Sequence, residues 1–372
     1  MSNRPSPYPQ RMTARALGLA TGILTTGPQN DICDVPGVLV GHATVVEGEG
    51  ALAPGQGPVR TGVTAVVPHG GNLFADKVPA AAFVLNGFGK CTGLAQVQEL
   101  GTLETPILLT STLSAFRAAD ALVSVMVEQN PSIGITTGTV NCVVGECNDG
   151  HLNDIQGRHV GEEQVRAALR NASAGPVEQG VVGAGTGVVC YGFKGGIGSA
   201  SRMVGDYVVG ALVQANFGRR SDLMVAGVSV GQLLLEYPGE EGPEPENVPP
   251  GSIMIVLATN APLDARQLGR LCKRGALGLA RTGASASNGS GDFVLGFSTA
   301  YRVPHEAPSD LARVDVLRDG APALDRLFLA AVEAVEEAVL NALFTAVTVE
   351  GRDGHVVHAL PVQGVLRFVK KT

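Results

Sequence analysis

The feature that most constrains this chain is an abrupt change of character at Ser252. The preceding segment, residues 236–251, carries five prolines and five glutamates but no Lys or Arg. Because proline cannot donate to a β ladder and clustered like charges resist packing, this segment is predicted to be an exposed loop. Residues 253–258, in contrast, form an apolar run of strand length, which is typical of a strand buried on both faces. A core strand therefore opens directly after a solvated loop, with Gly251 and Ser252 at the boundary.

This boundary has a chemical interpretation. If the Gly251–Ser252 bond were cut, Ser252 would be an N-terminal nucleophile, with its hydroxyl and a new α-amine on the same residue. An α-amine has a reference pKa of about 7.7–8.0, which suits a base near neutral pH. The simpler alternative is that Ser252 only begins a strand, and this stretch by itself leaves both interpretations open.

The composition favours closely packed sheets and disfavours two classes of partner. Of the 372 residues, 50 are glycine, and aromatic residues make up only 4%. Small and β-branched side chains allow tight sheets and close contacts between helices and sheets. The length suffices for a sizeable core in one or two domains. The net charge of −7 argues against nucleic acid or an anionic membrane as the main partner.

Cysteine usage and the N-terminus point to a cytoplasmic protein. The six cysteines are scattered, without a CxxC pair, and are expected to be reduced core thiols rather than a disulfide framework. Residues 1–14 are polar and proline-rich, and we expect a flexible tail there. They lack the apolar core of a secretory signal or a membrane anchor.

The remaining pattern alternates between strands and helices, which predicts a layered α/β or α+β domain. The last long helix is expected to carry Glu333, Glu336 and Glu337 on its solvated face. Strands are predicted at residues 60–68, 80–85, 106–112, 136–144, 207–215, 293–299 and 361–369, and helices at 115–128, 161–170, 263–280 and 323–346.

Two common kinds of site receive little support. The glycine-rich residues 183–187 could cradle a phosphate, but their spacing matches neither GxGxxG nor GxxxxGK[ST], so packing and turns are favoured. No histidine lies in a GxSxG or HExxH context, so neither a histidine-dependent serine hydrolase nor a metal centre is predicted. We expect no metal and no cofactor.

Nine short motifs in a fixed order make the chain recognisable. They are RALG at 15–18, DVPGVLVGH at 34–42, NGFGK at 86–90, ELGTLETP at 99–106, GECNDG at 145–150, GAGTG at 183–187, QANFG at 214–218, PGS at 250–252 and NGSGD at 288–292. With these motifs the sequence resembles the L-aminopeptidase/D-esterase family, which includes the β-peptidyl aminopeptidases. The resemblance extends over residues 15–369, which is nearly the whole chain.

The resemblance implies a fold, a maturation step and an activity. Members are made as inactive precursors that cleave themselves before a serine and keep both pieces in an αββα four-layer sandwich. That sandwich resembles N-terminal nucleophile hydrolases with different connectivity. Here it implies one catalytic domain, residues 15–372, cut into an α chain 1–251 and a β chain 252–372. The implied enzyme is a homo-oligomer, by resemblance a tetramer. It is a serine-type aminopeptidase that releases N-terminal residues from small peptides, amides or esters, including D- or β-residues in some members.

The resemblance also assigns site residues one by one. Ser252 matches the nucleophile, and Ser290 matches a second serine that hydrogen-bonds it. Asp292 matches an acidic residue that orients Ser290, although some members have Glu at this position. Asn216 matches the amide of the oxyanion hole, and Glu146 matches the carboxylate that holds the free amine of the substrate. Without the family, Asn216 would be an ordinary turn residue and Glu146 a helix cap or the partner of an arginine.

Other readings remain beside this one. His151 stands where the family has Tyr, which would change the shape of the substrate pocket. An acyltransferase related to ornithine acetyltransferase would share the sandwich and the self-cleavage, but its nucleophile is usually Thr. A ligand-binding protein without catalytic activity, built on the glycine loops, is the third reading, and self-cleavage would exclude it.

Overall fold

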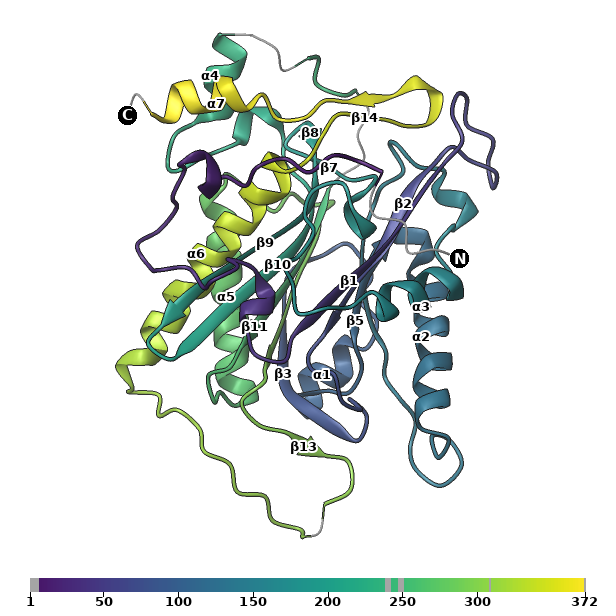
Figure 1. The fold of residues 1–372 in the computed structure, drawn as a ribbon, viewed down its shortest axis with the longest axis vertical. Helices are drawn as coiled ribbons and strands as arrows, with labels where there is room; N and C mark the ends of the chain where they lie inside the picture. The colour runs from purple at the N-terminus through teal and green to yellow at the C-terminus, as the bar shows by residue number, and fades with distance from the viewer. Residues whose placement is uncertain (1–6, 238–241, 247–250, 308, 371–372) are drawn as a thin grey trace.

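Two β-sheets face each other, and helices cover both outer faces (Figure 1). The computed structural model describes residues 7–237, 242–246, 251–307 and 309–370, so half of the acidic loop and the first part of the predicted tail lie outside the described residues. The smaller sheet has the strand order β1 (Leu39–Glu47), β2 (Val59–Val67), β5 (Ile107–Ser111) and β6 (Val143–Cys147).

The larger sheet contains the strand that begins at Ser252. Its order is β13 (Val303–Pro304), β3 (Asp76–Gly87), β12 (Gly291–Ser298), β11 (Ser252–Thr259), β10 (Tyr207–Asn216) and β9 (Gly196–Val204), and β4 (Thr102–Leu103) pairs with β3. Every residue of β11 is buried, as predicted from its apolar run. Two small hairpins lie outside these sheets: β7 (Val189–Cys190) with β8 (Phe193–Lys194), and β14 (Val349–Glu350) with β15 (Val356–Val357).

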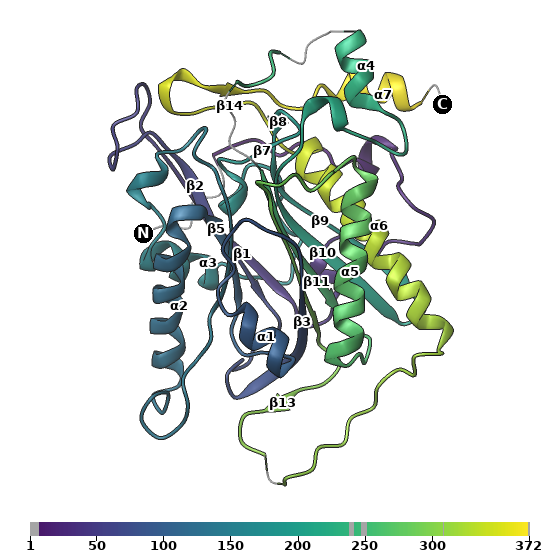
Figure 2. The same cartoon turned by 180° about the vertical axis from the view of Figure 1, so that it is seen from behind.

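Two pairs of helices form the outer layers, as the view from behind also shows (Figure 2). The smaller sheet is covered by α2 (Ala115–Gln129) and α3 (Glu162–Arg170), and the larger one by α5 (Ala265–Arg281) and α6 (Pro322–Phe344). The shorter helices are α1 (Leu94–Leu100), α4 (Val230–Glu236) and α7 (Val362–Val369). Asp264 caps α5 by accepting from the Gln267 amide, and Pro322 stands in the first turn of α6, where its missing N–H costs little.

Three apolar clusters fill the spaces between the layers. One joins α5 and α6 to the larger sheet, one lies between the sheets, and one joins the smaller sheet to α2 and α3. Glycine brings helix and strand together: a Cβ on Gly198 would lie 1.9 Å from the Ala338 carbonyl oxygen of α6, and one on Gly41 would lie 2.1 Å from that of Ala168 in α3. The predicted αββα four-layer sandwich is confirmed.

Two predicted strands need correction. Most of the segment 361–369 forms the helix α7 rather than a last strand, because Val362, Val365, Leu366 and Val369 recur at helical spacing. The strand predicted at 136–144 begins only at Val143 and continues to Cys147.

The prediction of a solvated glutamate face on α6 was wrong. Glu333, Glu336 and Glu337 are 1%, 6% and 0% exposed. The reason is Arg202 of β9, which is fully buried and places its guanidinium 3.1 Å from the Glu333 carboxylate and 2.6 Å from that of Glu337. Arg281 pairs with Glu336 at 3.1 Å. Buried carboxylates are tolerated here because each has a cationic partner.

The described part of the predicted tail packs on the domain. Arg11 donates to the carbonyl oxygens of Ala346 and Leu360 at 2.6 and 3.2 Å, and Ala14 is fully buried. Residues 1–6 lie outside the described residues. Within the described chain, none of the helices combines the length and apolarity needed to cross a membrane.

Candidate active site

Strand register brings the predicted catalytic residues to one edge of the larger sheet. Asn216, at the end of β10, is directly opposite Ser252, at the start of β11. Ser252 is in turn opposite Gly291 of the parallel strand β12, so Ser290 and Asp292 flank its partner. Neighbouring strands lie about 4.8 Å apart. Residues that are far apart in sequence therefore come together across adjacent strands.

Ser252 is enclosed and has an available hydroxyl. The residue is 6% exposed, and its Oγ has no hydrogen-bond partner among the described residues. The preceding Gly251 lies close to the backbone at the end of β10, because a Cβ on Gly251 would lie 2.4 Å from both the Asn216 carbonyl oxygen and the Phe217 Cα. Only glycine fits this position without a shift of the backbone.

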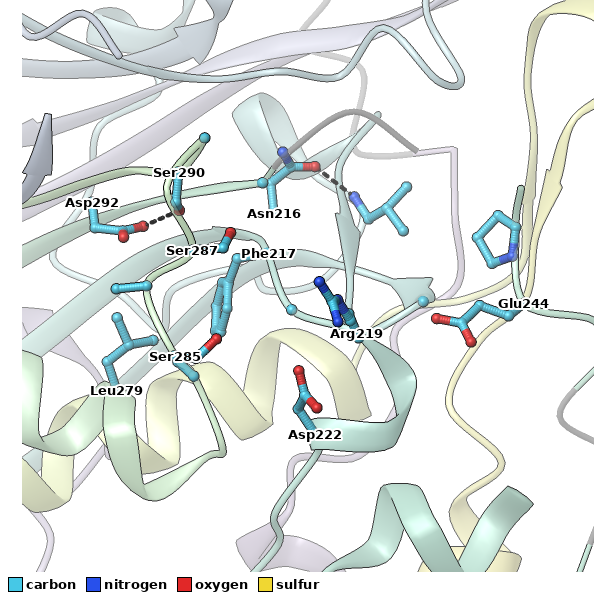
Figure 3. Close-up of a pocket in the computed structure, with 18 residues that line it drawn as sticks. Asn216, Phe217, Arg219, Asp222, Glu244, Leu279, Ser285, Ser287, Ser290 and Asp292 are labelled. Atoms are coloured by element: carbon cyan, nitrogen blue, oxygen red, sulfur yellow. Dashed lines mark hydrogen bonds between the residues drawn. The ribbon is translucent and has the colours of Figure 1, made fainter. Parts of the chain in front are cut away.

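The Asn216 amide has a fixed orientation. Its Oδ1 accepts from the backbone N–H of Val189 at 2.9 Å (Figure 3), and its side chain is almost fully buried. Since Oδ1 is occupied, Nδ2 points the other way, and within the described chain it donates no hydrogen bond. A preorganised amide N–H of this kind can stabilise a developing oxyanion.

Ser290 and Asp292 form a buried pair. The Ser290 hydroxyl donates to Asp292 Oδ1 at 2.6 Å, and each residue is 3% exposed (Figure 3). Burial raises the pKa of Asp292, while hydrogen bonds from the Ser290 hydroxyl and the Ile253 backbone work against that rise. In the described structure no hydrogen bond joins Ser290 to Ser252, so the predicted link between the two serines is not formed.

Lys194 supports the segment that contacts Asn216, and the sequence analysis did not identify it. It is fully buried, and its Nζ donates to the carbonyl oxygens of Gly185, Val188 and Gly195 at 2.9, 2.8 and 2.8 Å. Burial lowers its pKa to about 7. These bonds fix the loop whose Val189 amide orients Asn216. The sequence signal that could have identified Lys194 is that it is a lone lysine inside a glycine-rich apolar stretch.

A cavity of about 530 Å³ opens at this edge, a size typical of small-molecule sites. Its lining includes Asn216, Gly251, Ser290 and Asp292. It also includes three charged residues that sequence reasoning did not single out, namely Arg219, Asp222 and Glu244.

Glu146 lies near this edge but outside the cavity lining. It is a buried residue of β6, and it accepts from the Lys90 backbone N–H at 2.8 Å and from the Thr112 hydroxyl. The Lys90 ammonium is 3.8 Å from Glu146 Oε1. A Cβ on Gly89 would lie 3.3 Å from both Glu146 Oε1 and Gly291 Cα, so the Gly89 loop passes between this carboxylate and β12.

The remaining sequence features lie away from the cavity. His151 is stacked on His355, with ring centroids 4.6 Å apart, and burial lowers its pKa to about 4. It does not line the cavity, and its expected effect on the shape of the substrate pocket stays a prediction. The glycines of residues 183–187 are closely packed, as favoured from their spacing: Gly185 and Gly187 lie against backbone atoms, and Gly183 lies against the Thr64 and His42 side chains. In the described part of the chain, no three His, Cys, Asp or Glu residues gather in a way that could hold a metal ion.

The comparisons with known proteins agree with this geometry. The model of peptidase family S58 matches residues 30–357. The chain is 41% identical to the β-peptidyl aminopeptidase of Sphingosinicella microcystinivorans over 359 residues, covering 93% of this chain and 89% of that protein. A crystal structure of a Pyrococcus horikoshii protein superimposes with a TM-score of 0.90 at 50% identity, covering 97% and 99% of the two chains.

A further solved structure defines the class of fold. The L-aminopeptidase D-Ala-esterase/amidase of Ochrobactrum anthropi has 40% identity and a TM-score of 0.87, covering 96% of this chain and 99% of that one. It is described as a prototype of the serine aminopeptidases and as a new variant among Ntn hydrolase folds. The fold and site thus define a serine-type aminopeptidase of the N-terminal nucleophile type. The chain belongs to peptidase family S58.

Proposed function

We propose that the chain cleaves itself between Gly251 and Ser252 and then works as an aminopeptidase through Ser252. The observation that carries this proposal is the convergence of Asn216, Ser252 and the Ser290–Asp292 pair at one edge of three adjacent strands. This edge presents a nucleophile, a donor for an oxyanion and a buried hydroxyl–carboxylate pair, which are the groups that acyl transfer requires.

The maturation step uses the same groups. Ser252 Oγ attacks the Gly251 carbonyl carbon, the C–N bond breaks, and an ester links Gly251 to Ser252 Oγ while the Ser252 amine is released. Water then hydrolyses the ester, giving a Gly251 carboxylate and restoring the hydroxyl. The new α-amine takes the Oγ proton in later turnovers. The close approach of Gly251 to the Asn216 backbone supports this step, because it brings the proposed cleavage site next to the proposed oxyanion residue.

The substrates we propose are small peptides, amides and esters with a free amine. Attack by Ser252 expels the leaving amine or alcohol and forms an acyl-enzyme, which water hydrolyses. The names of the relatives support this range, since one is a β-peptidyl aminopeptidase and another an L-aminopeptidase D-Ala-esterase/amidase. The acyltransferase alternative has no support, because the matching family is one of peptidases.

Glu146 is the proposed receptor for the substrate amine. The Lys90 ammonium lies 3.8 Å from this buried carboxylate, which supports its pairing with a positively charged group. The Lys90 side chain is 44% exposed, so a substrate amine can displace it. A carboxylate has about four lone-pair positions, and the Lys90 amide and the Thr112 hydroxyl use two of them. The tetrameric state expected from the resemblance and the cytoplasmic location expected from the cysteine usage remain predictions.

A denaturing gel of the purified protein tests the maturation step. Wild-type protein should give two bands, corresponding to residues 1–251 and 252–372. The S252A variant should give a single uncut chain without aminopeptidase activity, because the attacking hydroxyl is absent. A cut S252A protein, or an uncut wild type that is fully active, would contradict the proposal.

A further inference from the structure

The charged and amide side chains that line the cavity differ in whether they already have hydrogen-bond partners. Glu244 accepts from the Arg220 backbone N–H at 3.1 Å, Asp222 accepts from the Ser221 hydroxyl at 3.0 Å, and Asp292 accepts from Ser290. The Arg219 guanidinium, in contrast, makes no hydrogen bond and no ion pair within the described chain. Together with Asn216 Nδ2, it is an unused donor facing the cavity, and both donors are complementary to oxygen-bearing groups.

The backbone places Arg219 close to the oxyanion residue. It follows Asn216 by three residues, a span of at most about 10 Å. Gly218 turns the chain between them with φ +86°, and a Cβ there would lie 2.5 Å from the Tyr191 ring. Arg219 lies among the cavity-lining residues, between Asn216 and Asp222 (Figure 3).

The leaving group of the reaction enters this cavity, an inference that rests on the proposed function. If Glu146 holds the amine of the acyl part, that part lies toward β6 and the Gly89 loop. None of the residues of β6 or of that loop lines the cavity. The group expelled from the scissile bond therefore enters the cavity, where Arg219 meets it.

We propose that Arg219 binds the free carboxylate of the departing amino acid, which makes short peptides, and dipeptides foremost, the preferred substrates over C-terminal amides. In a dipeptide this carboxylate is separated from the scissile nitrogen by a single Cα. A guanidinium presents a planar fork that matches a carboxylate with two parallel hydrogen bonds. Asp222 and Glu244 repel a carboxylate from the other charged parts of the wall, so Arg219 defines a single position for it.

The test compares a dipeptide with its C-terminal amide. For wild type we expect kcat/KM to be about tenfold higher for the dipeptide, since one charge-assisted contact contributes about 1.4 kcal/mol. The R219Q variant should lose this preference, mainly through KM. The R219K variant should keep part of it, because the charge remains without the fork. Added salt should weaken the wild-type preference, because Arg219 is solvent-exposed.

Two controls make the outcomes distinguishable. R313Q removes an exposed arginine that does not line the cavity, and it should keep the wild-type preference. The p-nitroanilide of the same N-terminal residue reports aminopeptidase activity without any carboxylate. Equal rates for dipeptide and amide in wild type, or equal losses on all three substrates in R219Q, would overturn the role of Arg219. A processed wild type that cleaves none of the three would overturn the proposed function itself.

Discussion

Replacing Asn216 by Asp changes one group of the proposed oxyanion hole and little else. Oδ1 can still accept from the Val189 amide, which holds the side chain at 2.9 Å in the native protein. Nδ2 becomes an oxygen that cannot donate and that repels a developing negative charge. Removing one oxyanion-hole donor typically lowers kcat by about 10²–10³, or about 2.7–4 kcal/mol, so N216D should lose at least that much.

The N216A variant should affect both catalysis and stability. It removes the donor as well, so kcat should fall by about 10²–10³. It also leaves the buried Val189 N–H without an acceptor, which should lower the free energy of unfolding by about 1–3 kcal/mol. Both variants should therefore lose activity, and both should lose stability, N216A because the Val189 N–H is unpaired and N216D because a carboxylate is buried without a cationic partner.

The assay measures kcat on an amino-acid p-nitroanilide and the midpoint of urea unfolding, using only the processed fraction of each protein. Self-cleavage passes through the same kind of oxyanion, so we also expect slower processing in both variants. N288D is the matched control, because it adds the same charge at an exposed amide in the turn before Ser290. A processed and folded N216D with wild-type kcat would remove Asn216 from the oxyanion hole.

Two further predictions concern the carboxylates. Asp292 accepts more strongly from Ser290 when it is ionised, and burial raises its pKa. Below the fall in kcat that protonation of the Ser252 α-amine causes, kcat should therefore fall more steeply as the pH drops through a value above the usual 3.8. D292N should lower kcat and abolish this second step, and an unchanged second step would assign it to another group. The E146Q variant should lose most of kcat/KM on free-amine substrates, because an unmatched buried charge costs about 3–5 kcal/mol, roughly 10²-fold or more. N-acetylated substrates should be poor for wild type, and equal discrimination against them in E146Q would exclude Glu146 as the amine receptor.

The elements of the fold could be predicted where a local pattern determines them. The strand after Ser252 and the long helix α6 follow from an apolar run and from helical periodicity. The burial of Glu333 and Glu337 could not be predicted in this way, because the reason for it is Arg202, a residue of a strand far away in sequence. Periodicity identifies which face of a helix is apolar, but it does not reveal a buried cation opposite the polar face.

The candidate site likewise combines features that the sequence predicts with features that only the fold reveals. The roles assigned to Asn216 and Asp292 came from the family resemblance, whereas the role of Ser252 was already suggested by its place between loop and strand. Only strand pairing could show that these residues share an edge. Lys194 and Arg219 were missed because single lysines and arginines are usually solvated. Their roles depend on position: one is enclosed by three carbonyl oxygens, and the other lines the cavity.

The location of the site also indicates what self-cleavage changes. Asn216, Ser252 and Asp292 lie on three strands that are hydrogen-bonded to one another, and every residue of β11 and β12 is buried. Residues on such paired and packed strands are held more rigidly than residues on loops. Cutting the bond before Ser252 should therefore leave the positions of these side chains nearly unchanged. What it alters is the nitrogen of Ser252, which changes from an amide without basicity into an amine with a reference pKa of about 7.7–8.0. We infer that processing activates the enzyme by supplying the base, whereas the oxyanion donor and the Ser290–Asp292 pair are already assembled in the precursor.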